Sequence, residues 1–423
     1  MSDFVFSLPV SGMDGNKYCH PLDVSREYLA TLTNNLVILK HFYKGYSANN
    51  FGNASPKEGE TFLVRLPNRY KMFDGWDITQ YNTVQEHVVP ITMDMATHIP
   101  LEISDNDLTL YINDFAKLFL EPAALQAAND LDFMAAGSYK QVYHQVGTPG
   151  TTPSDLLTFL QSGMVLDYNS VPRDGKRWGI IDPVTNMYLV DALKGLYNPS
   201  QIISGQYVEG TMNNASGLKF QMSQNLQLHT NGLFEPVAGQ TIKLKFAITE
   251  GASQVVMYNF ASATPTVNEG DIFTIAGIYE VNMMNKQNTG LVQQFVATSD
   301  GVWNGVSETM TVDVSPVIKA DPADPYQNVT SLGVVDAAIY FSGDSEQIYP
   351  INLVFHESAF CFVSANLNIP GGVDYAASET IEGINTRIAR QWSIGNSKYV
   401  TKLDMLFGKP KCIRPEMAVR IAG

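Results

Sequence analysis

The most regular pattern in the chain is a run of apolar residues at helical spacing between residues 104 and 142. The apolar side chains recur every three or four positions: Leu108, Tyr111, Ile112, Phe115, Leu118, Phe119, Leu125, Ala128, Leu131, Ala135, Tyr139 and Val142. Ser104 is a suitable N-cap, and Asp105 and Asp107 follow where the helix dipole favours acids. Pro122 should break or restart the helix because proline lacks the backbone N–H. The pattern predicts a long helix whose second half alone spans roughly 30 Å.

Two further regions also contain helical patterns. Residues 28–43 (YLATLTNNLVILKHFY) form one amphipathic segment. Between residues 149 and 232 we expect a helix over 153–163, a strand over 178–181 and a second helix over 184–194. This second region is therefore of α/β character.

Residues 57–103 alternate apolar and polar side chains around turn signals, which is typical of a long hairpin. The two halves read ETFLVRLPNRYKMFDGWDITQ and HVVPITMDMATHIPLEI. Pro67 and the Asp74-Gly75 pair limit where the strands run. The side chains are too mixed in polarity to form a buried core alone, so we expect the hairpin to lean on another part of the fold.

Residues 233–344 have a different sequence pattern. Short segments alternate apolar and polar residues, as in QTIKLKFAITEG, GDIFTIAGIYEV and ETMTVDVSPVI. Turn signals recur every ten to fifteen residues, and the loop ADPADPYQN closes the region. This spacing predicts a small antiparallel barrel or sandwich. Because α/β texture resumes at Pro350, we interpret the β-region as an insertion into another domain.

The C-terminal segment, residues 350–421, contains two long runs. The first reads PINLVFHESAFCFVSANLNIPGG and the second GINTRIARQWSIGNSKYVTKLDMLFGKPKCIRPEMAVRI. The second run consists of two alternating segments around a Gly-Asn-Ser turn, which predicts a strand pair. It ends in a segment interrupted by proline, which predicts an edge strand.

Composition describes a globular protein. The chain has 423 residues, 45% of them hydrophobic and 16% charged, enough for two or three domains. No stretch approaches eighteen consecutive apolar residues, and the N-terminus lacks the pattern of a signal peptide. Three widely spaced cysteines fit a reduced cytoplasmic protein better than a disulfide framework. Cys361 and Cys412 lie in apolar strand-like contexts and are expected to be buried packing residues.

Charge is unevenly distributed along the chain, whose net charge is −15. Residues 233–344 contain four lysines, no arginine and twelve acids, a net charge of −8. Residues 383–423 contain eight basic residues and only two acids, Asp404 and Glu416, a net charge of +6. The asymmetry reflects either chance clustering on solvated faces or an oriented subunit. In the second case an acidic module faces outward and a basic sheet faces inward or towards neighbouring subunits.

A search for catalytic chemistry finds no signal above background. The seven histidines are scattered without metal-ligand spacing, and the phosphate, dinucleotide and nucleophile-elbow motifs are absent from the sequence. Asp321 and Asp324 could bind calcium, but their prolines more simply make a turn and the full set of oxygen ligands is missing. We therefore predict no cofactor, no metal and no enzymatic activity.

The C-terminal segment and the passage IISGQYVEGTMNNASGLKFQMSQNLQLHTNG at 201–232 resemble the major capsid (coat) proteins of tailed bacteriophages. A Val-Pro pair and a following arginine strand that lead to Asp182-Pro183 occur in the same order in those proteins. The resemblance covers most of residues 57–421, and it is closest to coat proteins of short-tailed phages that carry an inserted domain.

The resemblance implies an α+β fold, the tailed-phage major capsid fold with an inserted antiparallel β-barrel. Its implied parts are an N-terminal arm at 1–55, an extended loop and peripheral-domain strands at 56–103, a spine helix of the peripheral domain at 104–148, an axial domain at 149–232 and 345–382, the barrel at 233–344, and return strands at 383–423. The barrel would stabilise the monomer and decorate the outer surface. Relatives can carry a long charged hairpin there, whereas the candidate tip at 250–254 is short and has one charge.

The implied function is self-assembly into hexamers and pentamers of an icosahedral phage head around double-stranded DNA. Implied partners are a scaffolding protein, a portal protein and the packaged DNA, bound non-specifically, with no membrane. The protein would be made in the bacterial host cytoplasm and reside in the virion. An encapsulin-like nanocompartment shell protein and, in a different class, a β-rich enzyme or adhesin remain as alternatives.

Two groups of charged residues are candidates for contacts between subunits. The first lies on the predicted hairpin: Arg65, Arg69, Lys71, Asp74 and Glu86. The second lies on the final strand pair: Arg387, Arg390, Lys398 and Lys402. Charges of this kind set the register of an interface more than its affinity. The alternatives are a solvated hairpin and charges that deter misdirected strand pairing.

Overall fold

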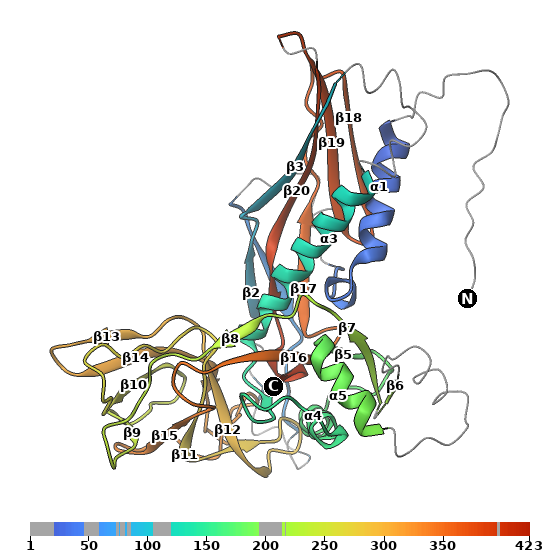
Figure 1. The fold of residues 1–423 in the computed structure, drawn as a ribbon. Coiled ribbons are helices and arrows are strands. Elements are labelled where there is room, and N and C mark those ends of the chain that lie inside the picture. Colours follow the sequence, from blue (N-terminus) through green and yellow to red (C-terminus); the bar gives the residue numbers. More distant parts are fainter. Residues whose placement is uncertain are drawn as a thin grey trace.

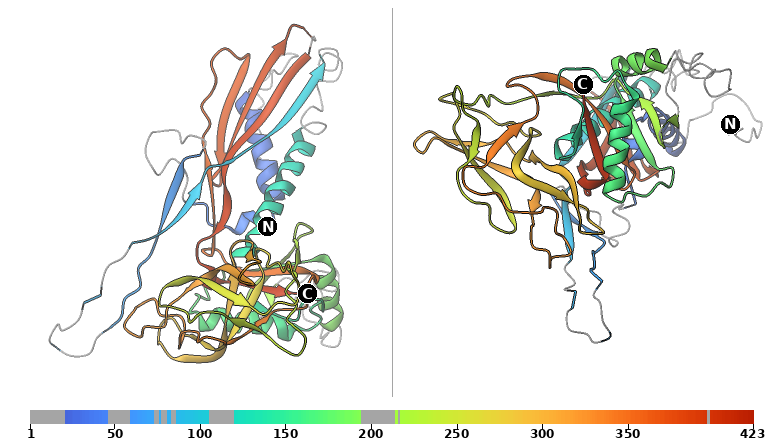
Figure 2. Two further views of the ribbon diagram at one scale, coloured as in Figure 1. Left: turned by 90° about the vertical axis from the view of Figure 1, so that its left-hand side faces the viewer. Right: turned by 90° about the horizontal axis from the view of Figure 1, so that it is seen from below.

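The structure, a computed structural model, describes residues 21–45, 59–72, 76, 81–82, 86–104, 120–193, 214–215, 217–395 and 398–423. The described chain is L-shaped (Figure 1). A long sheet with two helices forms the upright part, and a second sheet with a β-barrel beside it forms the foot. A hairpin projects from the side of the molecule (Figure 2).

The upright part is built on an antiparallel sheet of five strands. In spatial order these are β17 (Phe360–Ala365), β20 (Lys398–Cys412), β19 (Ile384–Ser393) and β18 (Tyr375–Ile381), with β3 (Met95–Ser104) also paired to β20. The strand pair predicted around the Gly-Asn-Ser turn is confirmed by β19 and β20. Because their side chains alternate, Ile388 and Leu403 point to one face of the sheet, and this face is buried.

Helices α1 (Pro21–Asn35) and α3 (Glu121–Ala136) cover that buried face (Figure 1). α3 carries Pro122 in its first turn, as the sequence predicted, while residues 105–119 of the predicted helix lie outside the described residues. The amphipathic segment predicted over 28–43 buries most of its apolar side chains in one core, but it is not a single helix, because α1 ends at Asn35. The buried carboxylate of Asp132 instead accepts hydrogen bonds from the backbone N–H groups of residues 37, 38 and 39, at 2.7, 3.1 and 2.9 Å.

The hairpin consists of β1 (Thr61–Leu66) and β2 (His87–Thr92), which are antiparallel. It lies on the face of the long sheet opposite the helices, and this confirms that it leans on another part of the fold. The shared core is formed by Phe62, Val64, Ile91, Met93, Cys361, Val363, Ala365, Leu406 and Ile413. Cys361 and Cys412 are buried free thiols, as predicted, and burial raises the pKa of Cys361 to about 12.

The foot contains a mixed sheet of the order β4 (Gln145–Val146), β21 (Ala418–Ala422), β16 (Ile348–His356), β5 (Arg177–Ile181), β7 (Leu218–Met222) and β6 (Asn214–Ala215), with β8 (Leu228–Thr230) extending β16. The prediction that the chain ends in an edge strand is wrong. β21 lies between β4 and β16, and the nearest proline, Pro415, belongs to the short helix η7 (Pro415–Met417).

Helices α4 (Leu156–Tyr168) and α5 (Pro183–Leu193) pack on one face of this mixed sheet. β5 and α5 confirm their predictions closely. α4 differs from the predicted 153–163: the backbone of Asp155 is extended, so the helix begins after it. It continues past Gly163 because Val165 and Leu166 pack into the core.

Residues 233–344 contain a closed antiparallel barrel of six strands. The strands are β10 (Ala252–Tyr258), β9 (Ile242–Leu244), β15 (Ala338–Phe341), β11 (Ile272–Val281), β12 (Asn288–Ala297) and β14 (Thr309–Ile318), and β10 pairs back to β14. β13 (Val302–Asn304) pairs with β14 outside the ring. The chain enters and leaves the barrel side by side, since Glu346 N–H donates to Gly232 O at 3.1 Å. The predicted barrel insertion is confirmed.

Candidate assembly surfaces

The hairpin carries an exposed ion pair beside its strands. Arg65 Nη1 and Glu86 Oε1 are 3.6 Å apart, and both side chains are largely exposed. Lys71 Nζ donates to the carbonyl oxygen of Pro322 at 3.1 Å. Asp74, the remaining predicted residue of the hairpin tip, lies outside the described residues. An exposed ion pair such as that of Arg65 and Glu86 contributes little to stability.

Arg69 is held within its own subunit. Its Nη2 donates to Glu416 Oε1 at 2.7 Å, and its guanidinium lies 5.6 Å from the ring centroid of Tyr326. Its backbone N–H also donates to the Tyr326 hydroxyl at 3.1 Å. Arg69 therefore joins the hairpin to η7 and to the barrel.

Three of the four predicted residues on β19 and β20 share the face of the long sheet that the helices do not cover. Arg387 and Lys402 both pair with the carboxylate of Asp404, Lys402 at 2.8 Å. Lys398 Nζ lies 3.0 Å from Glu102 on β3. The fourth, Arg390, points to the other face, where its guanidinium stacks 3.8 Å from the ring centroid of Tyr399. The basic character of this segment is thus partly neutralised inside the subunit.

The tip of the hairpin also exposes large apolar side chains, which the sequence argument did not identify as interface residues. Tyr70, Met72, Trp76 and Tyr81 are 63%, 91%, 103% and 80% exposed. Clustered exposed aromatic side chains mark interaction surfaces. The signal was present in the run YKMFDGWDITQY, but its polar residues favoured the interpretation of a solvated turn.

A buried polar network joins the barrel to the mixed sheet. His229 Nε2 pairs with Asp271 Oδ1 at 2.9 Å, and His229 Nδ1 lies 3.0 Å from the Tyr139 hydroxyl. Asp271 Oδ2 also accepts the N–H groups of Gly232 and Asn268, at 3.1 and 2.7 Å. Burial lowers the pKa of His229, which favours the neutral ring that bridges Tyr139 and Asp271.

Arg420 on β21 lies beside this network and is fully buried. Its Nη2 donates to the carbonyl oxygen of Gly270, and its guanidinium lies over the ring of Tyr139. Asp271 supplies a nearby negative charge. A buried arginine needs such compensation, because an unpaired buried charge costs several kcal/mol. The barrel therefore contributes groups that the core of the subunit requires.

A second contact between barrel and core contains an acid, Glu280, whose pKa is raised by burial. Glu280 on β11 lies 3.7 Å from His144 Nε2, which accepts a hydrogen bond from Asn169 at 2.9 Å. Burial lowers the pKa of His144 to about 3 and raises the pKa of Glu280 to about 7. Since the imidazole is neutral, it does not offset the charge of the carboxylate.

We expect Glu280→Gln to stabilise the subunit at pH 8 and to have little effect at pH 5. Burial raises the pKa of Glu280 in the folded state from 4.5 to about 7. Its contribution to stability is therefore fully present below about pH 4.5, and it is lost as the pH rises through about 7 and the buried carboxyl ionises. The shift corresponds to about 3 kcal/mol at most. Denaturant unfolding of free subunits at both pH values measures the difference. Glu235→Gln, at an exposed barrel position, is the control, and equal pH profiles for both variants would contradict the expectation.

The described residues show no arrangement typical of a catalytic or metal site. No group of three His, Cys, Asp or Glu side chains in this part of the chain could hold a metal ion. Asp321 and Asp324 accept backbone hydrogen bonds from residues 323 and 326, which makes their loop a pair of turns. Glu250, in the candidate barrel tip, accepts the N–H groups of residues 320 and 321. Within the described residues, no helix has the length and apolar character needed to cross a membrane.

Comparison with protein families gives a match over nearly the whole chain. The family model described as "P22 coat protein - gene protein 5" matches residues 23–423. Among solved structures, the chain is similar to one of Mycobacterium phage Che8, with 11% identity, a TM-score of 0.42 and coverage of 91% of this chain and 90% of that chain. It is also similar to the capsid structure of cyanophage P-SCSP1u, with 12% identity, a TM-score of 0.43 and coverage of 87% of this chain and 84% of that chain. The CUS-3 coat protein I-domain is 25% identical over 25% of this chain and 99% of that chain, with a TM-score of 0.20. No curated protein sequence matches the chain.

Proposed function

Because the chain belongs to the P22 coat protein family and is the major capsid protein of a tailed-phage head, we propose that its copies form hexamers and pentamers that close an icosahedral shell around double-stranded DNA. The protein is a structural component of the virion, not an enzyme. The observation that carries the proposal is the hairpin, whose tip leaves Tyr70, Met72, Trp76 and Tyr81 in water. A neighbouring subunit would bury these side chains.

The predicted charged residues fit this arrangement as contacts between subunits. Arg387, Lys398 and Lys402 lie on the face of the long sheet that α1 and α3 do not cover, and the subunit's own hairpin covers part of this face (Figure 2, left). We propose that the hairpin of the adjacent subunit crosses the uncovered part of this face, and that Arg65, Lys71 and Glu86 fix its register. The basic sheet then faces its neighbours.

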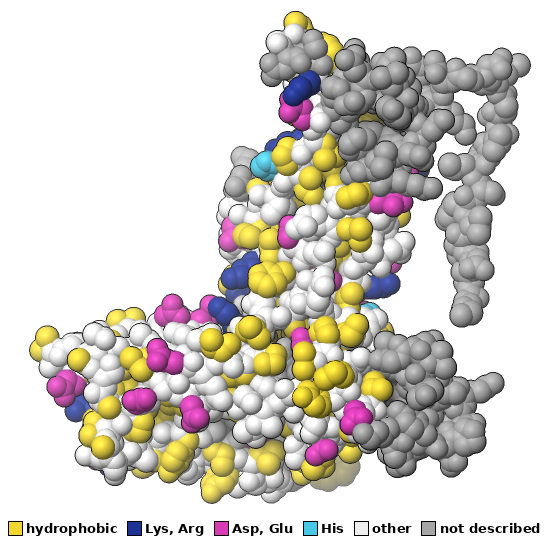
Figure 3. All heavy atoms as spheres, viewed as in Figure 1, with side chains coloured by type: hydrophobic (Ala, Val, Ile, Leu, Met, Phe, Trp, Pro, Cys, Tyr) yellow, Lys and Arg dark blue, Asp and Glu magenta, His cyan; other side chains and the backbone are white. Residues whose placement is uncertain are grey.

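The barrel fits the outer surface of the shell. Acidic side chains are spread over it in the space-filling view (Figure 3). Like-charge repulsion disfavours an acidic module next to packaged DNA. We propose that the barrel faces outward, and that a scaffolding protein and a portal protein act on the assembling shell in the bacterial cytoplasm.

Assembly of the purified chain tests the proposal. We expect closed shells in negative-stain microscopy and a fast-sedimenting species, with the scaffolding protein of the same phage added where the chain alone stays unassembled. Subunits that remain monomeric under both conditions would contradict the proposal.

We further expect Trp76→Ser to leave the subunit fold unchanged and to reduce the yield of shells, because the side chain is fully exposed in the free subunit. Circular dichroism checks the fold and sedimentation measures the yield. Leu228→Ser, at an exposed position of the mixed sheet, is the control for loss of apolar surface. A normal shell yield from the Trp76 variant would exclude a role of the tip in assembly.

A further inference from the structure

Helix α4 has an apolar face on each side, but only one of them is covered by its own subunit. Phe159, Val165 and Leu166 point into the core. On the opposite side Leu157, Leu160, Met164 and Tyr168 form a stripe at helical spacing, 61%, 48%, 41% and 40% exposed. A helix that is apolar all round is typically buried all round. Within the part of the chain that the structure describes, the outer stripe of α4 is therefore left largely uncovered.

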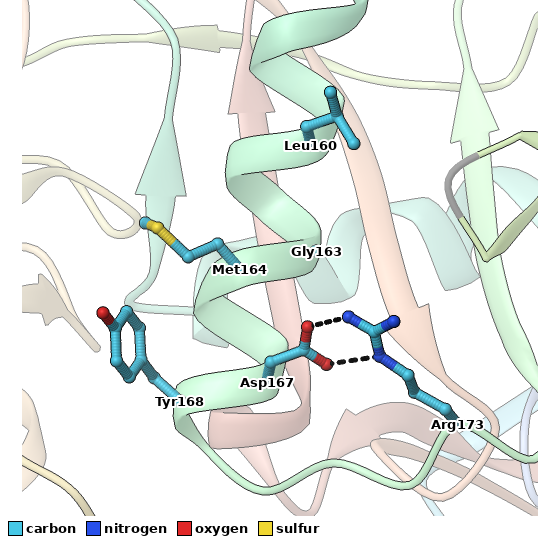
Figure 4. A pocket seen from close by; sticks show the side chains of 6 residues that line it. All are labelled: Leu160, Gly163, Met164, Asp167, Tyr168 and Arg173. Atoms are coloured by element: carbon cyan, nitrogen blue, oxygen red, sulfur yellow. Dashed lines mark hydrogen bonds and ion pairs between the residues drawn. The ribbon is translucent and has the colours of Figure 1, made fainter.

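A groove runs along this stripe. Its volume is about 440 Å³, and Leu160, Gly163, Met164, Asp167, Tyr168 and Arg173 line it (Figure 4). Apart from its two chain neighbours and the backbone of its own helix, a Cβ atom at Gly163 would meet no atom of the described residues within 4 Å, so the groove has space at that point. Glycine inside a helix costs about 1 kcal/mol relative to alanine, and nothing in the isolated subunit offsets this cost. Space at Gly163 is explained if a side chain from outside enters the groove.

The charged groups at the groove are already paired. Asp167 accepts hydrogen bonds from Arg173 and from the buried Arg177, and the bonds from Arg173 lower the pKa of Asp167. The lining therefore offers no free positive charge to a nucleic acid. A paired carboxylate and guanidinium beside apolar side chains suit a protein surface that is itself largely apolar.

We propose that the α4 stripe, defined as Leu157, Leu160, Met164 and Tyr168 together with the groove at Gly163, packs against a second copy of this chain within a ring of subunits. The proposal rests on the proposed function, since a capsid subunit always meets copies of itself. The hairpin and α4 lie on opposite sides of the foot (Figure 2, left). Contacts between two different surfaces are head-to-tail, and they form rings where the rotation between neighbouring copies closes. α5 covers the same sheet face as α4 and also exposes Val184, Met187 and Tyr188, which continues the apolar surface.

Substitutions at the stripe test this contact. Leu160→Asp should leave the free subunit folded and lower the yield of shells by at least about tenfold, because a carboxylate is costly to bury in an apolar interface. Gly163→Ala should raise the thermal stability of the free subunit, and Gly163→Leu should block the groove and reduce assembly. Val306→Asp, at a 98% exposed position of the barrel, is the control for added charge and should assemble normally. Stripe variants that assemble like the unmodified chain would overturn the proposal.

Footprinting keeps the test decisive if a variant fails to fold. Hydroxyl-radical labelling of Met164 and Tyr168 in the unmodified chain should fall when free subunits become shells. Equal labelling in both states would overturn the proposal. Protection that is lost when a scaffolding protein is removed from intact shells would also overturn it, because the scaffolding protein and not a second copy would then cover the stripe. Failure of the unmodified chain to form shells would instead refute the proposed function.

Discussion

Replacing Asp271 by alanine is expected to lower the free energy of unfolding by about 3–5 kcal/mol, because each buried donor left without an acceptor costs about 1–3 kcal/mol. The carboxylate is 1% exposed and accepts hydrogen bonds from His229 and from the backbone N–H groups of Gly232 and Asn268. Its loss leaves these three donors without their acceptor and removes the negative charge near Arg420. Both the barrel and the mixed sheet should be affected, since the network joins them.

Denaturant unfolding of free subunits measures this effect, with two variants as references. Asp271→Asn keeps an acceptor oxygen and the side-chain volume, so it should cost less than the alanine variant. Asp300→Ala removes an exposed carboxylate of the barrel that accepts a single backbone N–H, from Glu269 at 2.9 Å. A loss for Asp271→Ala as small as that for Asp300→Ala would show that the buried network does not hold barrel and core together.

Features with a short-range physical cause could be predicted from the sequence. The barrel was recognisable because each of its strands has one face in the core, which produces an alternating pattern, and because turns separate the strands. The contact of the hairpin with another part of the fold followed from its mixed polarity, since apolar side chains such as Phe62 and Val64 need a covering surface. The strand pair β19–β20 followed from alternation on both sides of one turn.

Features that depend on distant residues could not be predicted in this way. The end of α1 is set by Asp132, about ninety-five residues further along the chain. The interior position of β21 depends on β4 and β16, which no local pattern connects to it. Arg420, a lone arginine in the apolar strand AVRIA, was the one sequence signal of the buried network. Its neighbours Asp271 and Tyr139 cannot be identified without the fold.

The candidate interface residues illustrate the same limit. The sequence identifies Arg69 as a charged residue of the hairpin and Arg387 and Lys402 as charged residues of the strand pair, but it does not reveal that each has a partner in its own subunit. The α4 stripe could not be recognised as a surface from the sequence. Its residues look like the core positions of a helix, and only the structure shows that the core lies on the other side.

Excision of the barrel is the second change for which we expect a large effect. Glu346 N–H and Gly232 O are hydrogen-bonded at 3.1 Å, so a short Gly-Ser linker can replace residues 234–343 without moving the flanking strands. The remaining subunit should fold but lose several kcal/mol of stability, because Tyr143 is buried against Ile272 and Val296 of the barrel and loses this cover. Circular dichroism with denaturant measures the loss.

The excised subunit also separates two roles of the barrel. His229 and Arg420 become accessible to water in this variant, so the penalty for their unpaired groups should be smaller than in Asp271→Ala, where the barrel still covers them. The loss on excision then reports mainly the apolar contacts at Tyr143 and the link from Arg69 to Tyr326. If the excised subunit is as stable as the full chain, the barrel does not stabilise the core. A role for the barrel would then have to lie in its exposed acidic surface.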